Sequence, residues 1–296
     1  MPKGLGTIMW STIEKHIQEA TGQPFSIKHK ETALGGDINL CYWISNYHQN
    51  YFVKLNDKNH YTHFESEAYA LKQIKSSHQI NCPDVITMGN TLDKSFIVLS
   101  YIPFETPDLN DWYHLGQQLA HMHKNSSHGQ FGWQHDNFIG DTLQPNKWQS
   151  NWRTFFAEQR IAWQLQLLHE KSIKFGDIDH ITQVCHDALL HHQVKPSLVH
   201  GDLWQGNMGF SDHNPIIFDP ACYYGDREVD IAMTELFGQL PADFYHGYQK
   251  EFPLAKNYEQ RKLIYNFYHI LNHANIFGGI YIDQSKAALS VILSLH

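Results

Sequence analysis

One segment constrains the fold of this chain more than any other. An apolar, β-like run leads into residues His200–Asn207, which have the sequence HGDLWQGN. An acid, Asp202, and an amide, Asn207, are thus five residues apart in a loop that can carry both side chains into one site. A second apolar run, Pro215–Phe218, ends in a single acid, Asp219, twelve residues after Asn207. The pattern predicts strand ends that bring oxygen-bearing side chains together.

The segment resembles the catalytic loop HxDxxxxN of kinases, with glycine in the place of arginine, as in the aminoglycoside and choline kinases. In such loops the carboxylate lies beside the attacking hydroxyl, and the amide oxygen holds magnesium. The resemblance implies that Asp202 is the catalytic base and that Asn207 is a magnesium ligand. Asp219, in the place of the DFG aspartate, is then the second ligand, although the motif here reads Asp-Pro-Ala. Without that spacing, a strand-end aspartate would simply cap a turn.

The first third of the chain offers a candidate for nucleotide contact. Lys54 lies in the β-rich run Tyr51–Leu55, and Glu67 follows thirteen residues later on a predicted helix. A lone lysine in such a strand usually reaches solvent at a sheet edge. In kinases, a Lys–Glu ion pair between strand and helix directs the ammonium at the α- and β-phosphates of ATP. Glu65 is the competing partner, and Glu67 is preferred because it precedes Ala68 in the pattern EAxxL.

Two further features fit a nucleotide site. Gly35 and Gly36 form a turn signal between two strand-like segments, where backbone N–H groups could approach phosphate closely. A plain hairpin turn is the alternative, and it would be preferred if Lys54 and Asp202 were absent. The segment 96–102 resembles the kinase hinge, whose backbone would bond the adenine edge, so Leu99 and Tyr101 are expected to contact the nucleotide.

Periodicity divides the chain into a β-rich third and a mainly helical remainder. The elements predicted first are helices at 7–21 and 63–76, an extended segment at 25–30, and strands at 41–45, 51–55, 83–88 and 96–100. Helices are predicted at 115–123, after the Trp-rich stretch 131–163 as far as residue 190, and from 231 to the end. The segments 197–210 and 215–218 are β-like. We therefore expect an α+β, bilobal, protein-kinase-like fold. A nucleotide-binding lobe, 1–102, with a five-stranded antiparallel sheet and one main helix would precede a mostly helical catalytic and substrate-binding lobe, 103–296.

Composition and charge argue against several classes of protein. The net charge of -8 argues against a nucleic-acid binder, and the apolar C-terminal stretch is broken by polar residues, so no membrane span is expected. The N-terminus does not read as a signal peptide, and four scattered cysteines without a CxxC pair suit a reducing compartment, so a cytoplasmic protein is predicted. Neighbouring histidines such as His121 and His123 do not share a helix face, which argues against metal binding there.

Further segments narrow the resemblance. With the motifs above, they are similar to the fructosamine kinase (ketosamine kinase) family, and the matches keep their order from about residue 34 to residue 233. The matching positions are Phe131–Trp133, Asp136–Gly140, Asn146, Trp148, Trp152, Phe155, Phe156, Arg160 and the run Tyr224–Met233. HGDLWxGN followed by DPAxxYGDREVDIAM is highly specific. The short stretch between Asp219 and Asp230 leaves no room for a protein-kinase activation loop.

The resemblance implies magnesium- and ATP-dependent phosphorylation of the sugar 3-hydroxyl of ketosamines, a deglycation step. The acceptor would be a small or protein-linked ribulosamine, erythrulosamine or fructosamine, and the protein a monomer or weak dimer. Trp204, Trp148 and Trp152 are candidate contacts for the sugar, although Trp204 could equally brace the loop from the core. Asp230 is expected to brace the catalytic loop through backbone N–H groups, with a helix cap as the alternative.

Two other functions remain open at this point. A kinase of the same fold could act on choline or on an aminoglycoside, and a non-catalytic protein could bind a nucleotide without using it. The aromatic residues around Trp148 favour the ketosamine. Retention of the base, Asp202, argues against a mere binder, which would not need it.

Overall fold

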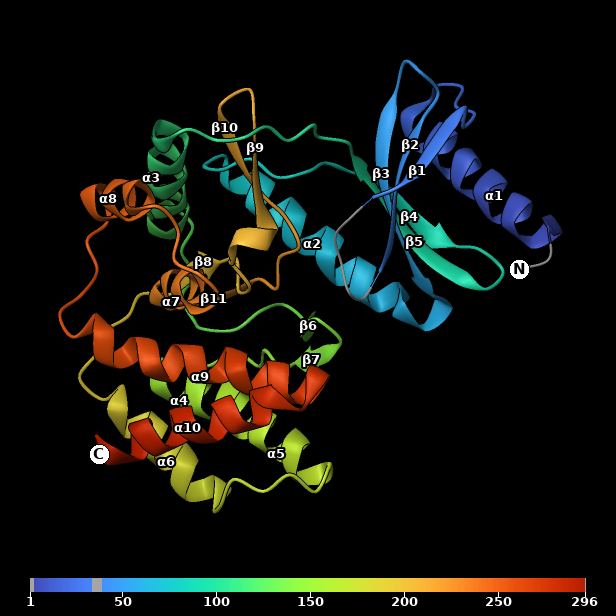
Figure 1. The fold of residues 1–296 in the computed structure, drawn as a ribbon. Coiled ribbons are helices and arrows are strands. Elements are labelled where there is room, and N and C mark those ends of the chain that lie inside the picture. The colour runs from blue at the N-terminus through green and yellow to red at the C-terminus, as the bar shows by residue number, and fades with distance from the viewer. Residues whose placement is uncertain (1–2, 34–38, 296) are drawn as a thin grey trace.

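The chain is arranged as a sheet-bearing N-terminal part and a mainly helical C-terminal part, here called the N-lobe and the C-lobe (Figure 1). A computed structural model describes residues 3–33 and 39–295. The N-lobe contains α1 (Lys3–Thr21), β1 (His29–Thr32), β2 (Leu40–Ser45), β3 (Asn50–Asp57), the short 3-10 helix η1 (Lys58–His60), α2 (Tyr61–Ser77), β4 (Val85–Asn90) and β5 (Lys94–Ser100). The strands form one antiparallel sheet in the order β1-β2-β3-β5-β4, which confirms the predicted five-stranded sheet. The domain boundary after residue 102 stays a prediction.

The two faces of this sheet are covered by different helices. Side chains alternate along a strand, so Val53 and its neighbours two residues away pack against Ile13 and Ile17 of α1. Phe52 points the other way, toward the cluster that contains Phe64 of α2. Lys54 shares that face with Phe52. The strand period thus directs the lysine at the helix that carries Glu67.

The first strand begins later than the sequence suggested. The extended segment was predicted at 25–30, but pairing with β2 as a strand starts only at His29. Phe25 instead lies in the apolar cluster under α1, where its ring packs edge-on against Tyr51. An apolar side chain in an extended segment can thus serve a core without joining the sheet.

The C-lobe is built mostly from helices, with short strand pairs between them. Three antiparallel pairs, β6 with β7, β8 with β11 and β9 with β10, hold the loops that face the N-lobe. The sequence did not predict β6, β7 or β11. The elements are α3 (Leu109–Asn125), β6 (Asn137–Ile139), β7 (Thr142–Gln144), α4 (Trp152–Phe156), the π-helix η2 (Ala157–Ala162), α5 (Trp163–Glu170), α6 (Ile178–Ala188), β8 (Ser197–Val199), η3 (Gln205–Asn207), β9 (Met208–Ser211), β10 (Asn214–Ile217), β11 (Tyr223–Gly225), α7 (Glu228–Leu236), α8 (Ala242–Glu251), α9 (Tyr258–Phe277) and α10 (Ile280–Ser294).

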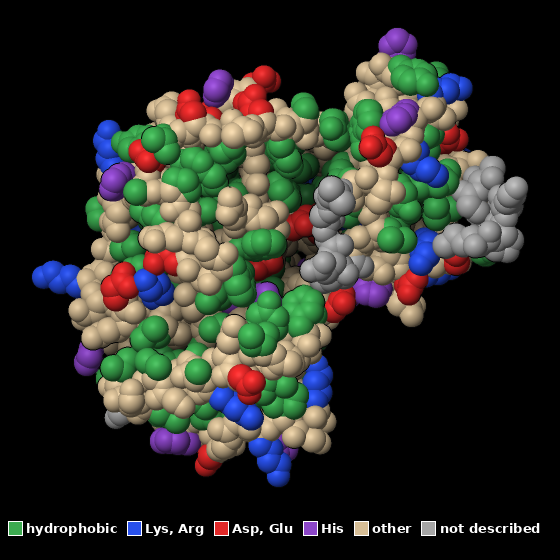
Figure 2. Space-filling model, viewed as in Figure 1, with side chains coloured by type: hydrophobic (Ala, Val, Ile, Leu, Met, Phe, Trp, Pro, Cys, Tyr) green, Lys and Arg blue, Asp and Glu red, His purple; other side chains and the backbone are tan. Residues whose placement is uncertain are grey.

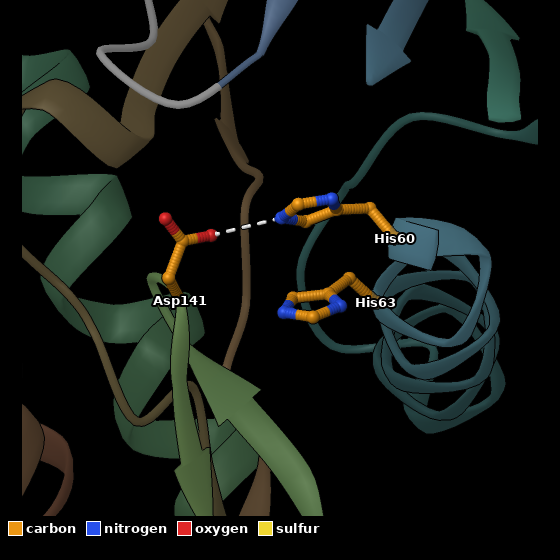
Figure 3. A group of neighbouring side chains, drawn as sticks. All are labelled: His60, His63 and Asp141. Carbon is orange, nitrogen blue, oxygen red and sulfur yellow. Dashed lines mark ion pairs between the residues drawn. The ribbon is translucent and has the colours of Figure 1, made fainter. Parts of the chain in front are cut away.

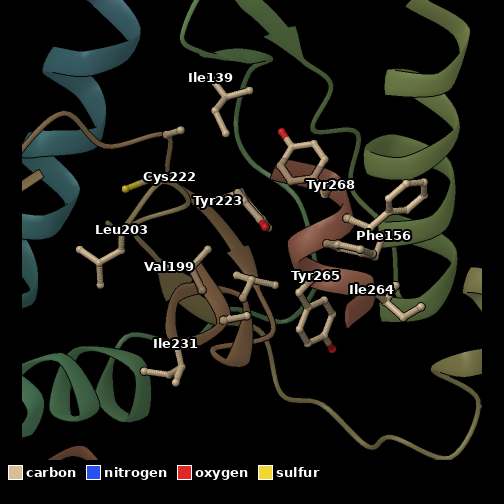
Figure 4. Packing of buried hydrophobic residues seen from close by; sticks show 14 of the residues in the cluster. Ile139, Phe156, Val199, Leu203, Cys222, Tyr223, Ile231, Ile264, Tyr265 and Tyr268 are labelled. Carbon is tan, nitrogen blue, oxygen red and sulfur yellow. The ribbon is translucent and has the colours of Figure 1, made fainter. Parts of the chain in front are cut away.

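An aromatic-rich core joins the catalytic segment to the last helices. Figure 4 shows Tyr223 of β11 facing Phe156 and Tyr268, with Val199 of β8 nearby. Arg160 is fully buried, and its guanidinium lies 4.1 Å from the centre of the Tyr223 ring. The core therefore supports the strand that leads into the HGD sequence.

The charged run 226–230 lies inside the protein, although such a run usually forms a solvated face. Asp226 accepts hydrogen bonds from Tyr265 at 2.5 Å and lies 2.6 Å from His192. Glu228 pairs with Arg261, whose Nε lies 2.7 Å from the carboxylate. Burial of charges is tolerated where each is paired and hydrogen-bonded, so this network fixes the start of α7.

The cysteines and several histidines have structural surroundings. All four cysteines are free, as predicted, and Cys41 is a buried strand residue whose pKa is raised to about 11 by burial. His121 contacts Glu251, and His123 is buried between Tyr248 and Asp230. Within the described ranges, no helix is both long and apolar enough to cross a bilayer.

Candidate active site

A cavity of about 670 Å³ lies between the lobes. Figure 2 shows the surface hollowed between the N-lobe and the C-lobe. The N-lobe contributes Lys54 and Glu67 to its lining, and the C-lobe contributes Asp202, Asn207 and Asp219. All five were singled out in the sequence, and the fold brings them to one place from segments far apart in the chain.

Lys54 links the two lobes at the cavity. Its ammonium lies 2.7 Å from a carboxylate oxygen of Glu67 on α2 and also contacts the carboxylate of Asp219. The expected pairing with Glu67 rather than Glu65 is present. Burial alone would lower the pKa of Lys54, but the carboxylates of Asp219 and Glu67 outweigh it and raise that pKa. The lysine is therefore a fixed, buried cation.

The loop after β8 is held by Asp230 of α7. Its carboxylate accepts hydrogen bonds from the backbone N–H groups of His200, at 2.7 Å, and Gly201, at 2.9 Å. Asp230 thus braces the loop as expected and does not act as a helix cap. Gly201 has a φ of +83°, and a Cβ there would lie 2.2 Å from the carbonyl oxygen of Ala221. The positive φ and this contact require glycine at position 201 in this loop.

Asp202 and Asn207 close the loop on each other. The amide nitrogen of Asn207 donates to the backbone oxygen of Asp202 at 2.8 Å and to its carboxylate at 3.2 Å. Burial, followed by repulsion from Asp219, raises the pKa of Asp202 to about 7, against the smaller opposing effect of the Asn207 hydrogen bond. A carboxyl group with such a pKa can exchange a proton near neutral pH.

Asp219 occupies a constrained position next to this pair. It follows β10 with a φ of +56°, a left-handed conformation that is uncommon for a residue other than glycine. The backbone N–H of Phe218 donates to the backbone carbonyl oxygen of Asn207 at 3.0 Å, which ties the two segments together. A carboxylate and an amide oxygen are ligands that magnesium prefers, and the Asn207 amide nitrogen is already used by Asp202. The donor set therefore fits magnesium.

The expected nucleotide contacts are only partly described. Gly35 and Gly36 lie outside the described residues. Leu99 is buried in the sheet at the end of β5, and the ring of Tyr101 packs 5.5 Å from Trp43. Neither of these two side chains lines the cavity. Contact through the hinge backbone stays a prediction.

Comparison with known proteins identifies the family. The sequence profile described as fructosamine kinase matches residues 9–295. The chain belongs to the fructosamine kinase family. It is 48% identical over 287 residues to a probable ketoamine kinase of Vibrio vulnificus, covering 97% of this chain and all of that protein. It is 43% identical to a probable ketoamine kinase of Synechocystis, covering 97% of each chain. The protein is thus a kinase, that is, a phosphotransferase.

Solved structures agree with the family at the level of the fold. A crystal structure described as a candidate fructosamine-3-kinase of Haemophilus somnus superposes with a TM-score of 0.93 at 35% identity, covering 98% of this chain and 99% of that one. The aminoglycoside phosphotransferase APH(4)-Ia, solved with AMP-PNP and hygromycin B, has a TM-score of 0.65 at 14% identity, covering 96% and 98%. The predicted kinase-like fold is confirmed, and this second likeness shows the fold alone.

The three tryptophans considered for the acceptor lie in different surroundings. Trp204 lines the cavity and is 41% exposed, with its indole against Gly206. Trp152 is 4% exposed, and its indole nitrogen donates to Tyr265 at 3.1 Å in the core. Trp148 stacks on His128 with ring centres 4.4 Å apart. Neither Trp148 nor Trp152 lines the cavity, so the structure gives no support to sugar contact for these two.

Other aromatic residues, from the C-terminal part of the chain, do line the cavity. Phe237, which follows α7, and His273 of α9 have ring centres 4.6 Å apart, and both line the cavity. Phe277 and Tyr281 continue this wall, each less than 6 Å from His273 between ring centres. The sequence analysis missed these residues. The four-residue spacing from His273 to Phe277 was visible, but which way that face points depends on how α9 packs.

Proposed function

We propose that this kinase transfers the γ-phosphoryl group of ATP to the sugar 3-hydroxyl of a ketosamine, a step in deglycation. The observation that carries the proposal is the convergence of Lys54, Asp202, Asn207 and Asp219 on one cavity in a fructosamine kinase family member. The volume of the cavity is within the range of small-molecule sites. A protein named as a probable ketoamine kinase, which this chain matches over its full length, supports the acceptor class.

Asp202 is proposed as the base that accepts the proton of the attacking hydroxyl. Its raised pKa makes the carboxylate a better proton acceptor than an ordinary aspartate at neutral pH. The hydrogen bond from Asn207 and the brace from Asp230 hold the loop that carries it. Because the transition state of phosphoryl transfer is loose, orientation of the hydroxyl contributes at least as much as proton removal.

Lys54 and the two proposed metal ligands, Asn207 and Asp219, are proposed to neutralise the negative charge of the phosphates. Lys54, held by Glu67, would pair with the α- and β-phosphates. Asn207 and Asp219 would hold Mg²⁺, which when bound neutralises charge on the β- and γ-oxygens. Asp219 is thus proposed to exchange its contact with Lys54 for a metal ligand role as the nucleotide enters.

The wall formed by Phe237, His273, Phe277 and Tyr281, with Trp204 beside the base, is proposed to hold the acceptor. Aromatic faces pack on the apolar face of a sugar and attract the cation of a secondary amine. The same faces could in principle hold choline, so choline is the rival that a test has to include.

The test is a comparison of kcat/KM for ribulose-lysine, erythrulose-lysine and fructose-lysine with kcat/KM for choline and kanamycin. All are measured with the same magnesium and ATP, and mass spectrometry locates the phosphate on the product. We expect at least one ketosamine to be the best substrate, phosphorylated at the 3-hydroxyl. If choline or kanamycin is the better substrate, the fold stands but the proposed acceptor is wrong.

A further inference from the structure

A group of three potential metal ligands lies where the two lobes meet, apart from the proposed magnesium ligands. His60 ends η1 and His63 lies in the first turn of α2, both in the N-lobe. Asp141 lies in the turn between β6 and β7 of the C-lobe. Figure 3 shows both imidazole rings with a nitrogen on the side that faces the Asp141 carboxylate. His60 and His63 also line the cavity.

The spacing suits a small, four-coordinate cation. Nε2 of His60 and a carboxylate oxygen of Asp141 are 3.4 Å apart, and the three residues offer ligand atoms that all lie within 4.8 Å of one another. In a tetrahedral zinc site with bonds of about 2.0–2.1 Å, neighbouring ligand atoms are about 3.4 Å apart. One edge of such a tetrahedron is therefore already in place, and the other separations need only a small closure.

The nitrogens of this group have no other use in the described part of the chain. Both ring nitrogens of His63 and Nδ1 of His60 are buried there without a hydrogen-bond partner. Leaving a buried polar atom unpaired costs about 1–3 kcal/mol. Phe138 stacks on His63 with ring centres 3.5 Å apart, which fixes the plane of the imidazole. Burial lowers the pKa of His63, as does the nearby His60, so the ring is held in its neutral, metal-binding form.

Two other clusters of acids and histidine lack this feature. The Asp111 carboxylate accepts a hydrogen bond from the backbone N–H of Asp108 at the start of α3 and also contacts His213, so its oxygens are used. Asp226 receives hydrogen bonds from Tyr265 and contacts His192. An ion pair between His60 and Asp141 alone would leave both nitrogens of His63 unused. A shared cation would bind one nitrogen of His63 together with one ligand atom each of His60 and Asp141.

We propose that His60, His63 and Asp141 form a binding site for a divalent transition metal of the zinc type, with a fourth position open to the cavity. Two imidazoles and one carboxylate with a free position form a ligand set typical of zinc. Magnesium, which prefers oxygen ligands, would not compete. Because the ligands come from both lobes, the bound ion joins α2 to the β6–β7 turn across the cavity. This proposal does not depend on the identity of the acceptor.

The test uses the full chain, with magnesium in excess so that Asn207 and Asp219 are occupied. Calorimetric titration with Zn²⁺ and the visible spectrum with Co²⁺ are compared for the wild type, His63→Ala, Asp141→Asn and the control His180→Ala. Asp141 is half exposed in a turn, so its amide variant keeps the fold, and His180 is an exposed histidine of α6 outside the cluster. Each protein is first checked for an unchanged melting curve without zinc.

We expect one zinc ion per wild-type chain, an intense four-coordinate cobalt spectrum and a higher Tm with zinc. His63→Ala and Asp141→Asn should each weaken zinc binding by more than about 100-fold, because losing even an outer partner of a ligand costs about 10- to 100-fold. His180→Ala should bind as the wild type does. Wild-type zinc affinity in both cluster variants, or an octahedral cobalt spectrum in the wild type, would overturn the proposal.

Discussion

The ammonium of Lys54, on β3 of the N-lobe, contacts the carboxylate of Asp219, in the C-lobe, so one ion pair spans the cavity. The two residues are 165 positions apart in the chain. Each has a second proposed partner: Glu67 already holds Lys54, and Asp219 is proposed to bind magnesium. The ion pair therefore places the proposed phosphate-binding cation and the proposed metal ligand where they could reach the same phosphates.

Replacing Asp219 by alanine should abolish productive binding of magnesium-ATP, because the remaining proposed ligand, Asn207, is neutral. Asn207→Ala should impair binding less. Thermal-shift titration with ATP, with and without magnesium, measures this. In the wild type we expect a magnesium-dependent rise in Tm that Asp219→Ala lacks. An unchanged magnesium-dependent shift in Asp219→Ala would contradict the metal assignment.

The two glutamates at the start of α2 provide a matched pair of variants. Glu67→Ala removes the carboxylate that lies 2.7 Å from the Lys54 ammonium and leaves the lysine paired with Asp219 alone. We expect the KM for ATP to rise about 10-fold or more, since about 1.4 kcal/mol corresponds to a factor of ten. Glu65→Ala, on the exposed side of the same turn, should change that KM less than about twofold. Equal effects of the two variants would argue against the ion pair.

Asp202→Asn should lose turnover by about 100- to 10,000-fold while it keeps magnesium-ATP binding, because the proposed base would contact the acceptor hydroxyl and not the nucleotide. Steady-state kinetics together with the ATP thermal shift separate the two effects. Near-normal turnover would exclude Asp202 as the base.

The same variant should also change the pH dependence of stability. The pKa of Asp202 is raised to about 7 in the folded protein, so the folded state binds more protons than the unfolded state between about pH 4 and pH 7. The free energy of unfolding of the wild type should therefore fall as the pH rises from about 4 to 7. Asp202→Asn should not lose stability in this way, because it has no proton to release. At pH 8 we expect the variant to be more stable by at most about 4 kcal/mol, at about 1.4 kcal/mol for each pKa unit. Urea unfolding at pH 4 and pH 8 measures it, and a difference that does not grow with pH would contradict the raised pKa.

Gly201→Ala should destabilise the fold by more than about 2 kcal/mol, because it combines left-handed strain with a Cβ 2.2 Å from the Ala221 carbonyl oxygen. Gly129→Ala is the matched control, since nothing lies within 4 Å of a Cβ built there. Chemical unfolding of both variants measures the contrast. A Gly201 variant as stable as the Gly129 variant would show that the loop is not held as tightly as the structure implies.

Local sequence carried most of what could be predicted. The spacing of Asp202, Asn207 and Asp219 belongs to two short segments, and their backbones hydrogen-bond directly to each other. Glu67 could be chosen as the partner of Lys54 because it precedes Ala68 in the pattern EAxxL, and the structure places the two side chains in contact. Asp230 could be assigned as a brace of the catalytic loop because it lies in the run Tyr224–Met233, which is specific to the family.

The acceptor side could not be predicted because it depends on tertiary packing. The aromatic residues of the segment 131–163 suggested a sugar pocket, but Trp152 packs into the core beside Tyr265. Four rings that do line the cavity follow α7 or lie in α9 and α10. Neither composition nor period tells which face of a buried helix meets a cavity. His63 and Asp141 were missed because the β6–β7 turn that brings Asp141 near α2 was not predicted.

The last prediction concerns that aromatic wall. Phe277 lines the cavity and is 51% exposed, so truncating it should cost little stability while it removes a face for the sugar or its amine. We expect Phe277→Ala to raise the KM for the preferred ketosamine about 10-fold, equivalent to about 1.4 kcal/mol, and to leave the KM for ATP unchanged. Ile280→Ala is the matched control, because Ile280 is 67% exposed at the start of α10 and does not line the cavity.

Trp152→Phe tests the opposite case. Loss of the hydrogen bond to Tyr265 should lower the Tm and leave the KM for the ketosamine and the KM for ATP unchanged. If Trp152→Phe raises the KM for the acceptor and Phe277→Ala does not, the acceptor lies on the side of the tryptophan-rich segment and not against the C-terminal helices.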